Sequence, residues 1–248
     1  MIEANLEKME ELKDGLDQAR TAGDLSAQAA MLYEIARLYH KEKIEDAARD
    51  YWIECRDLCR RAGLIQETAQ VMIDLGDLAR DRDDFDQAEE SYRSAQAIYQ
   101  ETGDLKGRAR ISERLGDLIS RKGDHEQALV FFREGLDLCR EHDDPIGCLF
   151  FLDQMMPLLR AGDKVSELEQ AGRLTITLAE KMGDRERMAL GLARLADLYI
   201  KTGRIKEAEA GLVLAHDLYL HLGRDKEAGL IRAELDRLDL DSVKSLSP

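Results

Sequence analysis

The sequence predicts an all-α solenoid, a stack of antiparallel helix pairs built from copies of one unit. A series of small residues is spaced by 40, and only Leu168 interrupts its alanines, which are Ala48, Ala88, Ala128 and Ala208. A glycine series with the same spacing is interrupted only by Asp143, its members being Gly23, Gly63, Gly103, Gly183 and Gly223. Apolar residues within each unit recur at steps of three and four, which is typical of one face of a helix. Positions that are multiples of 40 apart are called equivalent below.

In order along the chain, the first predicted helix lies within residues 1–23 and stands alone. Its surface is polar around Leu6, Met9, Leu12 and Leu16, which suits the exposed end of a stack. Five helix pairs follow as repeats, at residues 24–63, 64–103, 104–143, 144–183 and 184–223. A last single helix at 224–238 completes the solenoid of residues 1–238, with about 12 helices in total. Residues 239–248 show no helical pattern, so we expect a mobile tail.

The second helix of each repeat has a stripe in which small and large residues alternate. In the repeat at 64–103 the stripe consists of Phe85, Ala88, Tyr92, Ala95 and Tyr99. The corresponding residues of the first repeat are Ile44, Ala48, Trp52, Cys55 and Cys59. We expect neighbouring helices to approach closely at the small residues, while the large residue fills the space beside them.

Glycine also occurs inside predicted first helices, in Leu75-Gly76-Asp77 and Leu115-Gly116-Asp117. A glycine inside a helix costs roughly 1 kcal/mol relative to alanine. We therefore predict close contact between these glycines and the following helix, near Ala88 and Ala128. The pairs at the turns have a different role, because glycine followed by aspartate predicts a left-handed helix stop and a cap on the next helix. These pairs are Gly23-Asp24, Gly103-Asp104, Gly123-Asp124 and Gly183-Asp184.

The combination of Leu75-Gly76 with Ala88, Tyr92 and Ala95 resembles the tetratricopeptide repeat (TPR). HEAT and armadillo arrays have comparable periods, but the in-register pattern favours the TPR family. The usual TPR unit has about 34 residues, so this longer unit is similar to the extended form of kinesin light chains and Leu-Gly-Asn-type adaptors. The resemblance implies a right-handed superhelical solenoid that serves as a scaffold for protein–protein interaction.

Composition limits the partners of the chain. The net charge is −15, from 36 basic and 51 acidic residues, which argues against binding to nucleic acid or to an anionic membrane. A basic partner is permitted, although the acidity also serves solubility. The N-terminus has neither a basic start nor an apolar stretch, so we expect no signal peptide and a cytoplasmic protein.

The cysteines are predicted to be packing residues. Cys59 and Cys139 occupy equivalent positions, where other repeats carry Tyr99, Ala179 and Tyr219. Cys55 and Cys59 are four residues apart and could share a metal ion, but no second pair or histidine occurs at ligand spacing. The five histidines are scattered, and no phosphate-binding loop or nucleophile motif is present. We therefore expect no enzyme activity, cofactor or metal.

The fourth repeat, residues 144–183, departs most from the pattern. Met155-Met156-Pro157 stands where other repeats have Leu-Gly-Asp, and Gly172 takes the large position. Pro157 is expected to kink or end its helix. One interpretation is compensation, in which Phe151 and Met155 repack around the hole left by Gly172. The other is an interface at which Phe150 or Met156 is exposed to a partner. The candidate interface residues are Phe150, Phe151, Met155, Met156 and Pro157.

In the TPR family the first helices line a concave groove that holds peptides or helices. The resemblance implies a groove lined by Tyr33, Arg37, His40, Lys41, Ile73, Asp77, Arg80, Glu113, Asp117, Arg121, Phe150, Asp153, Arg160, Asp197 and Lys201. Acidic and basic residues at spacings of three and four along these helices could also form ion pairs within one helix. Whether these residues bind a partner or only pair with one another stays open at this stage.

The resemblance also bears on the type of partner. TPR receptors for chaperone tails hold a terminal carboxylate with lysine and asparagine, whereas the matching positions here include Asp77, Asp117 and Asp197. The acidic residues favour a partner with basic side chains or free backbone N–H groups. The first functional hypothesis is a scaffold or adaptor that binds a peptide or helix of another protein. The alternative is a ligand- or peptide-sensing module of a bacterial type, and self-association through the fourth repeat is a third option.

Overall fold

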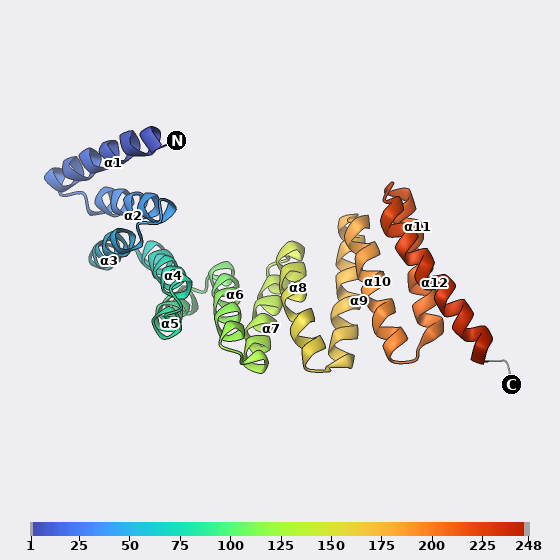
Figure 1. The fold of residues 1–248 in the computed structure, drawn as a ribbon. Coiled ribbons are helices and arrows are strands. Elements are labelled where there is room, and N and C mark those ends of the chain that lie inside the picture. Colours follow the sequence, from blue (N-terminus) through green and yellow to red (C-terminus); the bar gives the residue numbers. More distant parts are fainter. Residues whose placement is uncertain (1, 246–248) are drawn as a thin grey trace. The chain divides into compact units, whose positions relative to one another are not determined.

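The structure is a computed structural model that describes the backbone of residues 2–245 and the side chains of residues 7–238. Twelve α-helices account for nearly all of the described residues, and no strand occurs among them (Figure 1). The helices are α1 (Ile2–Ala22), α2 (Leu25–Lys41), α3 (Glu45–Ala62), α4 (Ile65–Asp81), α5 (Phe85–Thr102), α6 (Leu105–Arg121), α7 (His125–Glu141), α8 (Pro145–Ala161), α9 (Val165–Met182), α10 (Arg185–Lys201), α11 (Ile205–His221) and α12 (Asp225–Ser245). The prediction of five helix pairs flanked by single helices is confirmed.

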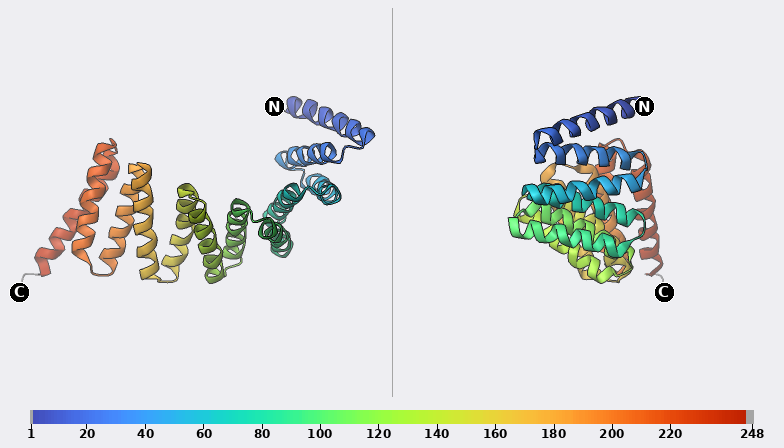
Figure 2. Two further views of the ribbon diagram at one scale, coloured as in Figure 1. Left: turned by 180° about the vertical axis from the view of Figure 1, so that it is seen from behind. Right: turned by 90° about the vertical axis from the view of Figure 1, so that its left-hand side faces the viewer.

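The chain divides into two compact units, Met1–His142 and Asp143–Pro248. The first unit contains α1 to α7 and the second contains α8 to α12. Within each unit, consecutive helices lie side by side in alternating directions (Figure 2). Because each helix packs mainly on its neighbours in the chain, the fold grows by addition and has no single globular centre. None of the helices in the described residues is long and apolar enough to cross a membrane.

The turns confirm the expected backbone conformations. The five glycines of the 40-residue series are left-handed, with φ between 67° and 71°. Asp143 adopts φ 57° in place of glycine, so the exception in the glycine series has the same conformation as its equivalents. The predicted aspartate caps also form, since Asp24, Asp104 and Asp184 each accept a hydrogen bond from the backbone N–H three residues on, at 2.9–3.0 Å.

The interior follows the small–large pattern of the second helices. Ala88, Ala95 and Tyr92 are fully buried in α5. A Cβ added to Gly76 would lie 2.5 Å from the ring of Tyr92, and one added to Gly116 would meet the ring of Phe132. The predicted close contact is therefore confirmed, and the partner in each case is the large residue of the following helix rather than its alanine.

In the fourth repeat the sizes at these two positions are reversed. Met156 stands at the position of Gly76, and Gly172 stands at the position of Tyr92. A Cβ on Gly172 would lie 2.7 Å from Leu195 of α10, so the predicted hole is filled by the next repeat. Phe151, Met155 and Met156 are all buried. The burial of Phe151 and Met155 agrees with a packing role, but Leu195, and not these two residues, fills the space at Gly172. Met156 is not the exposed anchor that the alternative suggested.

Two further predictions need correction. Helix α8 continues through Pro157 to Ala161, so this proline does not end the helix. Helix α12 continues to Ser245, beyond the predicted end at residue 238, so most of the proposed tail is helical. Residues 246–248 of that tail lie outside the described residues.

The four cysteines are buried and reduced. The Cys55 thiol donates to the carbonyl oxygen of Ala29 at 3.3 Å and lies 3.9 Å from the sulfur of Cys59. Burial raises the pKa of the Cys55 thiol, and the nearby Cys59 raises it further. A thiol that is held protonated inside the helix stack fits the predicted packing role.

Candidate functional site

The first helices of the repeats are α2, α4 and α6 in the first unit and α8 and α10 in the second. We call the surface that their polar positions form the first-helix face, and we describe it separately for each unit. The residues predicted to line a groove are all on these helices. They differ in accessibility, and this difference separates residues that can meet a partner from residues that cannot.

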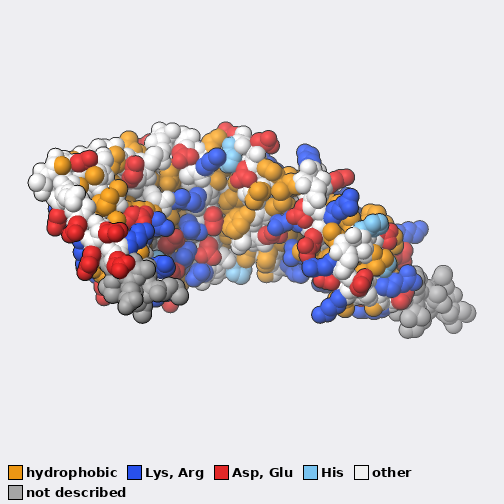
Figure 3. All heavy atoms as spheres, turned by 90° about the horizontal axis from the view of Figure 1, so that it is seen from above, with side chains coloured by type: hydrophobic (Ala, Val, Ile, Leu, Met, Phe, Trp, Pro, Cys, Tyr) orange, Lys and Arg blue, Asp and Glu red, His pale blue; other side chains and the backbone are white. Residues whose placement is uncertain are grey.

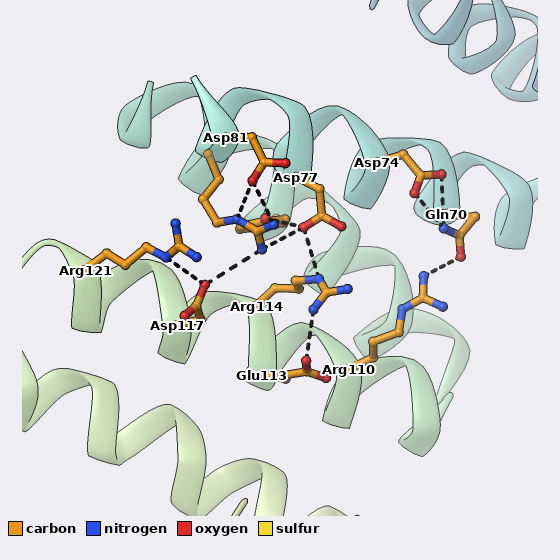
Figure 4. A network of polar contacts seen from close by, with 11 residues as sticks. Gln70, Asp74, Asp77, Asp81, Arg110, Glu113, Arg114, Asp117 and Arg121 are labelled. Carbon is orange, nitrogen blue, oxygen red and sulfur yellow. Dashed lines mark hydrogen bonds and ion pairs between the residues drawn. The ribbon is translucent and has the colours of Figure 1, made fainter. Parts of the chain in front are cut away.

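In the first unit, several predicted residues belong to one polar network between α4 and α6 (Figure 4). Asp77 lies at its centre, where it accepts a hydrogen bond from the Tyr92 hydroxyl at 2.6 Å. The same carboxylate pairs with Arg80 at 3.1 Å and with Arg114 of the next repeat at 3.0 Å. Burial and the Asp77 carboxylate raise the pKa of Tyr92, so the phenol remains a donor.

The network continues along both helices. Asp117 pairs with Arg121 at 3.2 Å and lies 3.8 Å from Arg80. Glu113 pairs with its neighbour Arg114 at 2.9 Å. The ion pairs that the spacing allowed within one helix therefore exist, and arginines also connect successive repeats. These carboxylates already have basic partners, so they do not form the unpaired acidic surface that the sequence suggested.

A second cluster lies at the other end of the same face. The Gln70 amide donates to both oxygens of Asp74, at 3.1 and 3.2 Å, and its carbonyl accepts from Arg110. Burial raises the pKa of Asp74, while the hydrogen bonds from Gln70 and Tyr33 lower it. Burial also raises the pKa of Tyr33, with a smaller contribution from Asp74. The half-buried Tyr33 is thus part of the packing between α2 and α4.

The remaining predicted residues of the first unit are less connected. Arg37 is exposed and pairs with Glu34 at 2.8 Å. The ring of His40 lies against Trp52, with centroids 5.3 Å apart, and Lys41 is exposed. Ile73 is only 1% exposed and belongs to the core, so it is unable to line a groove. The Ile73 side chain points into the core. Its place in the repeat alone did not predict this orientation.

The second unit contains a pocket of about 720 Å³ on its first-helix face. Helix α8 contributes the Asp153, Met156, Pro157, Arg160 and Ala161 side of the pocket. Residues of α10 form the opposite side, and Thr175 of α9 reaches the interior. The α10 side consists of Glu186, Arg187, Leu190, Gly191 and Arg194, together with Asp184, the N-cap residue of α10. Two helices that are equivalent in successive repeats thus enclose a space with both apolar and charged walls.

Most charged groups of this pocket are paired. Asp153 pairs with Arg187 at 2.9 Å and with Arg194 at 3.5 Å. Arg187 also lies 3.6 Å from Asp184, and Glu186 pairs with Arg224. Arg160 is different, because its exposed side chain makes no hydrogen bond or ion pair with any described residue. It is an available cation at the rim.

Arg160 also lines a second, smaller pocket of about 320 Å³ in the same unit. Asp197 and Lys201 line this space and pair with each other at 2.9 Å. The predicted residues Asp153, Arg160, Asp197 and Lys201 are therefore brought together around two adjoining pockets. Phe150 lies nearby on α8, where it is 37% exposed and its ring meets Phe151 edge-on with centroids 5.4 Å apart.

The larger pocket is lined by Gly191 of the fifth repeat, the one small residue in its series of equivalent positions. Equivalent positions carry Met31, Val71, Ile111, Phe151 and Ile231, whereas this repeat has Gly191. The series places a large apolar residue at every position except this one. Ile176 of α9 takes the place of the missing side chain, since a Cβ on Gly191 would lie 2.9 Å from it. The neighbouring Thr175 is buried and donates its hydroxyl to the Ala171 carbonyl at 3.0 Å.

Sequence reasoning missed the α10 side of the pocket, including Arg187, Leu190, Gly191 and Arg194. The fifth repeat keeps its conspicuous Leu195-Ala196-Asp197 segment and its glycine turns, so it appeared regular. Comparing all equivalent positions would have identified Gly191 as the exception. The pairing of Asp153 with arginines of α10 was harder to predict from the sequence, because it depends on how two repeats stack.

Comparison with protein families agrees with this architecture. Residues 27–101 and residues 67–141 each match the family model described as tetratricopeptide repeat. Residues 27–141 therefore belong to the tetratricopeptide repeat family. The TPR units here extend to 40 residues, as the equivalent positions and helix bounds show. No curated protein matches the sequence.

Solved structures share the fold of this TPR protein. BtubC (BKLC) from P. vanneervenii is 17% identical with a TM-score of 0.66, and the match covers 89% of this chain and 92% of that one. A signal transduction ATPase with numerous domains from Pyrococcus horikoshii, which has a TPR sensor, is 14% identical with a TM-score of 0.62; 85% of this chain and 33% of that one are covered. A Rap protein complexed with competence and sporulation factor is 14% identical with a TM-score of 0.58, covering 98% and 72%. At these identities the similarity shows the fold alone.

Proposed function

We propose that this TPR protein is a non-enzymatic interaction scaffold that binds a peptide or helix of a partner protein on the first-helix face of its second unit. The pocket between α8 and α10 is the observation that carries the proposal. Its volume of about 720 Å³ is within the range of sites that hold a compact group. Its walls combine apolar surface with arginines, which are enriched where proteins meet.

The first unit supports the proposal by contrast. Its first-helix face is occupied by the ion-pair network around Asp77, in which the charged side chains already have partners. A ligand that displaced them would have to replace those contacts, which lowers its net binding energy. The second unit provides an open pocket and an unpaired arginine, so a partner gains contacts there without breaking existing ones.

A photo-crosslinking residue in place of Leu190 tests this proposal in cells. Leu190 lines the pocket and is 40% exposed. Val213 on α11 is a matched control, because it is also aliphatic and 48% exposed but lies on a second helix. We expect a crosslinked partner protein from position 190 and none from position 213. Equal crosslinking from both positions, or none from 190, would contradict the proposal.

A peptide sensor is the second candidate function. Two structures with this fold are complexes, that of a Rap protein with competence and sporulation factor and that of the Rap conjugation gene regulator of the plasmid pLS20 with the Phr* peptide. The second of these is 18% identical with a TM-score of 0.51. A sensor would change its conformation on binding. The small-angle scattering curve of the chain should therefore change when a peptide that binds it is added. Unchanged scattering with saturating peptide favours the scaffold.

A further inference from the structure

One set of equivalent positions differs sharply between the two units. In the first helices of the first unit, these positions carry Ala30, Gln70 and Arg110. In the second unit the corresponding residues are large and apolar, namely Phe150, Leu190 and Leu230. They are 37%, 40% and 66% exposed. Large apolar side chains that recur at one exposed position form a row on a repeat protein, and such rows are features of interaction surfaces.

The apolar row adjoins the arginine side of the pocket. Leu190 and Arg194 lie one helical turn apart on α10, and both line the pocket. Across from them, Arg160 extends from the last turn of α8 with no partner among the described side chains. Asp153 is the single carboxylate that faces both Arg187 and Arg194. Asp184 and Glu186, the other acidic residues of the lining, pair with Arg187 and Arg224. The charge left unpaired at this rim is therefore that of Arg160, although the whole chain has a net charge of −15.

The backbone of α8 adds an acceptor in the same place. Pro157 has no N–H, so it cannot donate to the carbonyl of Asp153, which lies four residues earlier in the helix. Pro157 and Asp153 both line the pocket, and Pro157 is exposed. This carbonyl therefore lacks the donor that an α-helix normally provides.

We infer that the partner segment carries an acidic group next to a large apolar side chain, with the acidic group paired to Arg160 and the apolar side chain packed against Leu190 and Met156. This inference rests on the proposed function and specifies its ligand. It opposes the basic partner that the overall composition allows. Guanidinium groups pair strongly with carboxylates. In the space-filling view, hydrophobic side chains reach the protein surface between charged ones (Figure 3).

Selection from a random peptide library displayed on phage, with the full chain as bait, tests the inference. We expect enriched peptides to combine Asp or Glu with a large apolar residue. Their affinity should fall about tenfold for Arg160→Gln, the loss that one charge-assisted hydrogen bond supplies. Arg160 is exposed and unpaired, so this variant should retain the melting temperature of the natural chain.

The matched control is Arg232→Gln, which removes the same charge from α12 outside the pocket. Its affinity for the selected peptides should equal that of the natural chain. Peptides that are basic or uncharged, or that bind Arg160→Gln as tightly as the natural chain, would overturn the acidic ligand while leaving a peptide-binding function in place. A library that yields no enriched peptide would overturn the proposed function itself.

Discussion

At the residue scale, the stacking of helices depends on a small residue that packs against a large side chain. Gly76 lies against the ring of Tyr92, whose hydroxyl in turn donates to Asp77. In the fourth repeat the pair is reversed as Met156 and Gly172, and Leu195 of the following repeat occupies the space above the glycine. The sequence predicted the contact at Gly76, because a glycine inside a helix needs a reason. It could not predict Leu195, because that contact joins different repeats.

Alanine substitutions at two helical glycines separate packing from helix propensity. Gly76→Ala should lower the free energy of unfolding by about 2 kcal/mol, since the added Cβ collides with a fully buried ring. Gly229→Ala in α12 is the control, because nothing lies within 4 Å of its added Cβ. That variant should be more stable by up to about 1 kcal/mol. Urea unfolding measures both, and a stabilised Gly76→Ala would refute the packing account.

At the element scale, helix ends were largely predictable and contacts between helices were not. The glycine and aspartate pairs at the turns predict the local backbone conformation, because that conformation depends on only a few neighbouring residues. Glu169 of α9 illustrates the other case, because it accepts from Arg204 at 2.6 Å, Arg173 at 2.8 Å and the Tyr199 hydroxyl at 3.0 Å. These residues come from α9, α10 and the turn before α11, all in the second unit. No spacing in the sequence identifies such a cluster.

Glu169 should make the stability of the protein depend on pH. Hydrogen bonds from Arg204, and then from Arg173, lower the pKa of Glu169 from 4.5 to about 2. A depressed pKa contributes stability above pH 4.5, and that contribution disappears as the pH falls toward 2. Glu169→Gln should therefore cost about 1 kcal/mol at pH 7, a value reduced for partial solvent screening, and progressively less below pH 4.5.

Urea unfolding across this pH range measures the effect of Glu169. Glu180→Gln on the same helix provides the control, because the exposed Glu180 makes no ion pair with the described residues. The control variant should match the natural chain at each pH. A Glu169→Gln deficit that persists unchanged at pH 2 would show that the cluster is stabilised by packing rather than by the ionised carboxylate.

At the scale of the whole molecule, repeats with a common architecture provide two different first-helix faces. The face of the first unit is covered by ion pairs that join α4 to α6. The face of the second unit has a pocket, an exposed apolar row and the unpaired Arg160. Sequence analysis predicted the family and directed attention to the fourth repeat, residues 144–183. It missed α10, because the pocket lies between α8 and α10 and depends on how these two helices stack.

The central claim is that a partner binds to the first-helix face of the second unit. Hydrogen exchange of the full chain, with and without a peptide selected from the phage library, tests it most directly. Because binding stabilises the helices that it contacts, we expect the added protection to lie in α8 and α10, while α4 and α6 exchange as before. Protection confined to α4 and α6, or to the second helices of the repeats, would contradict the claim.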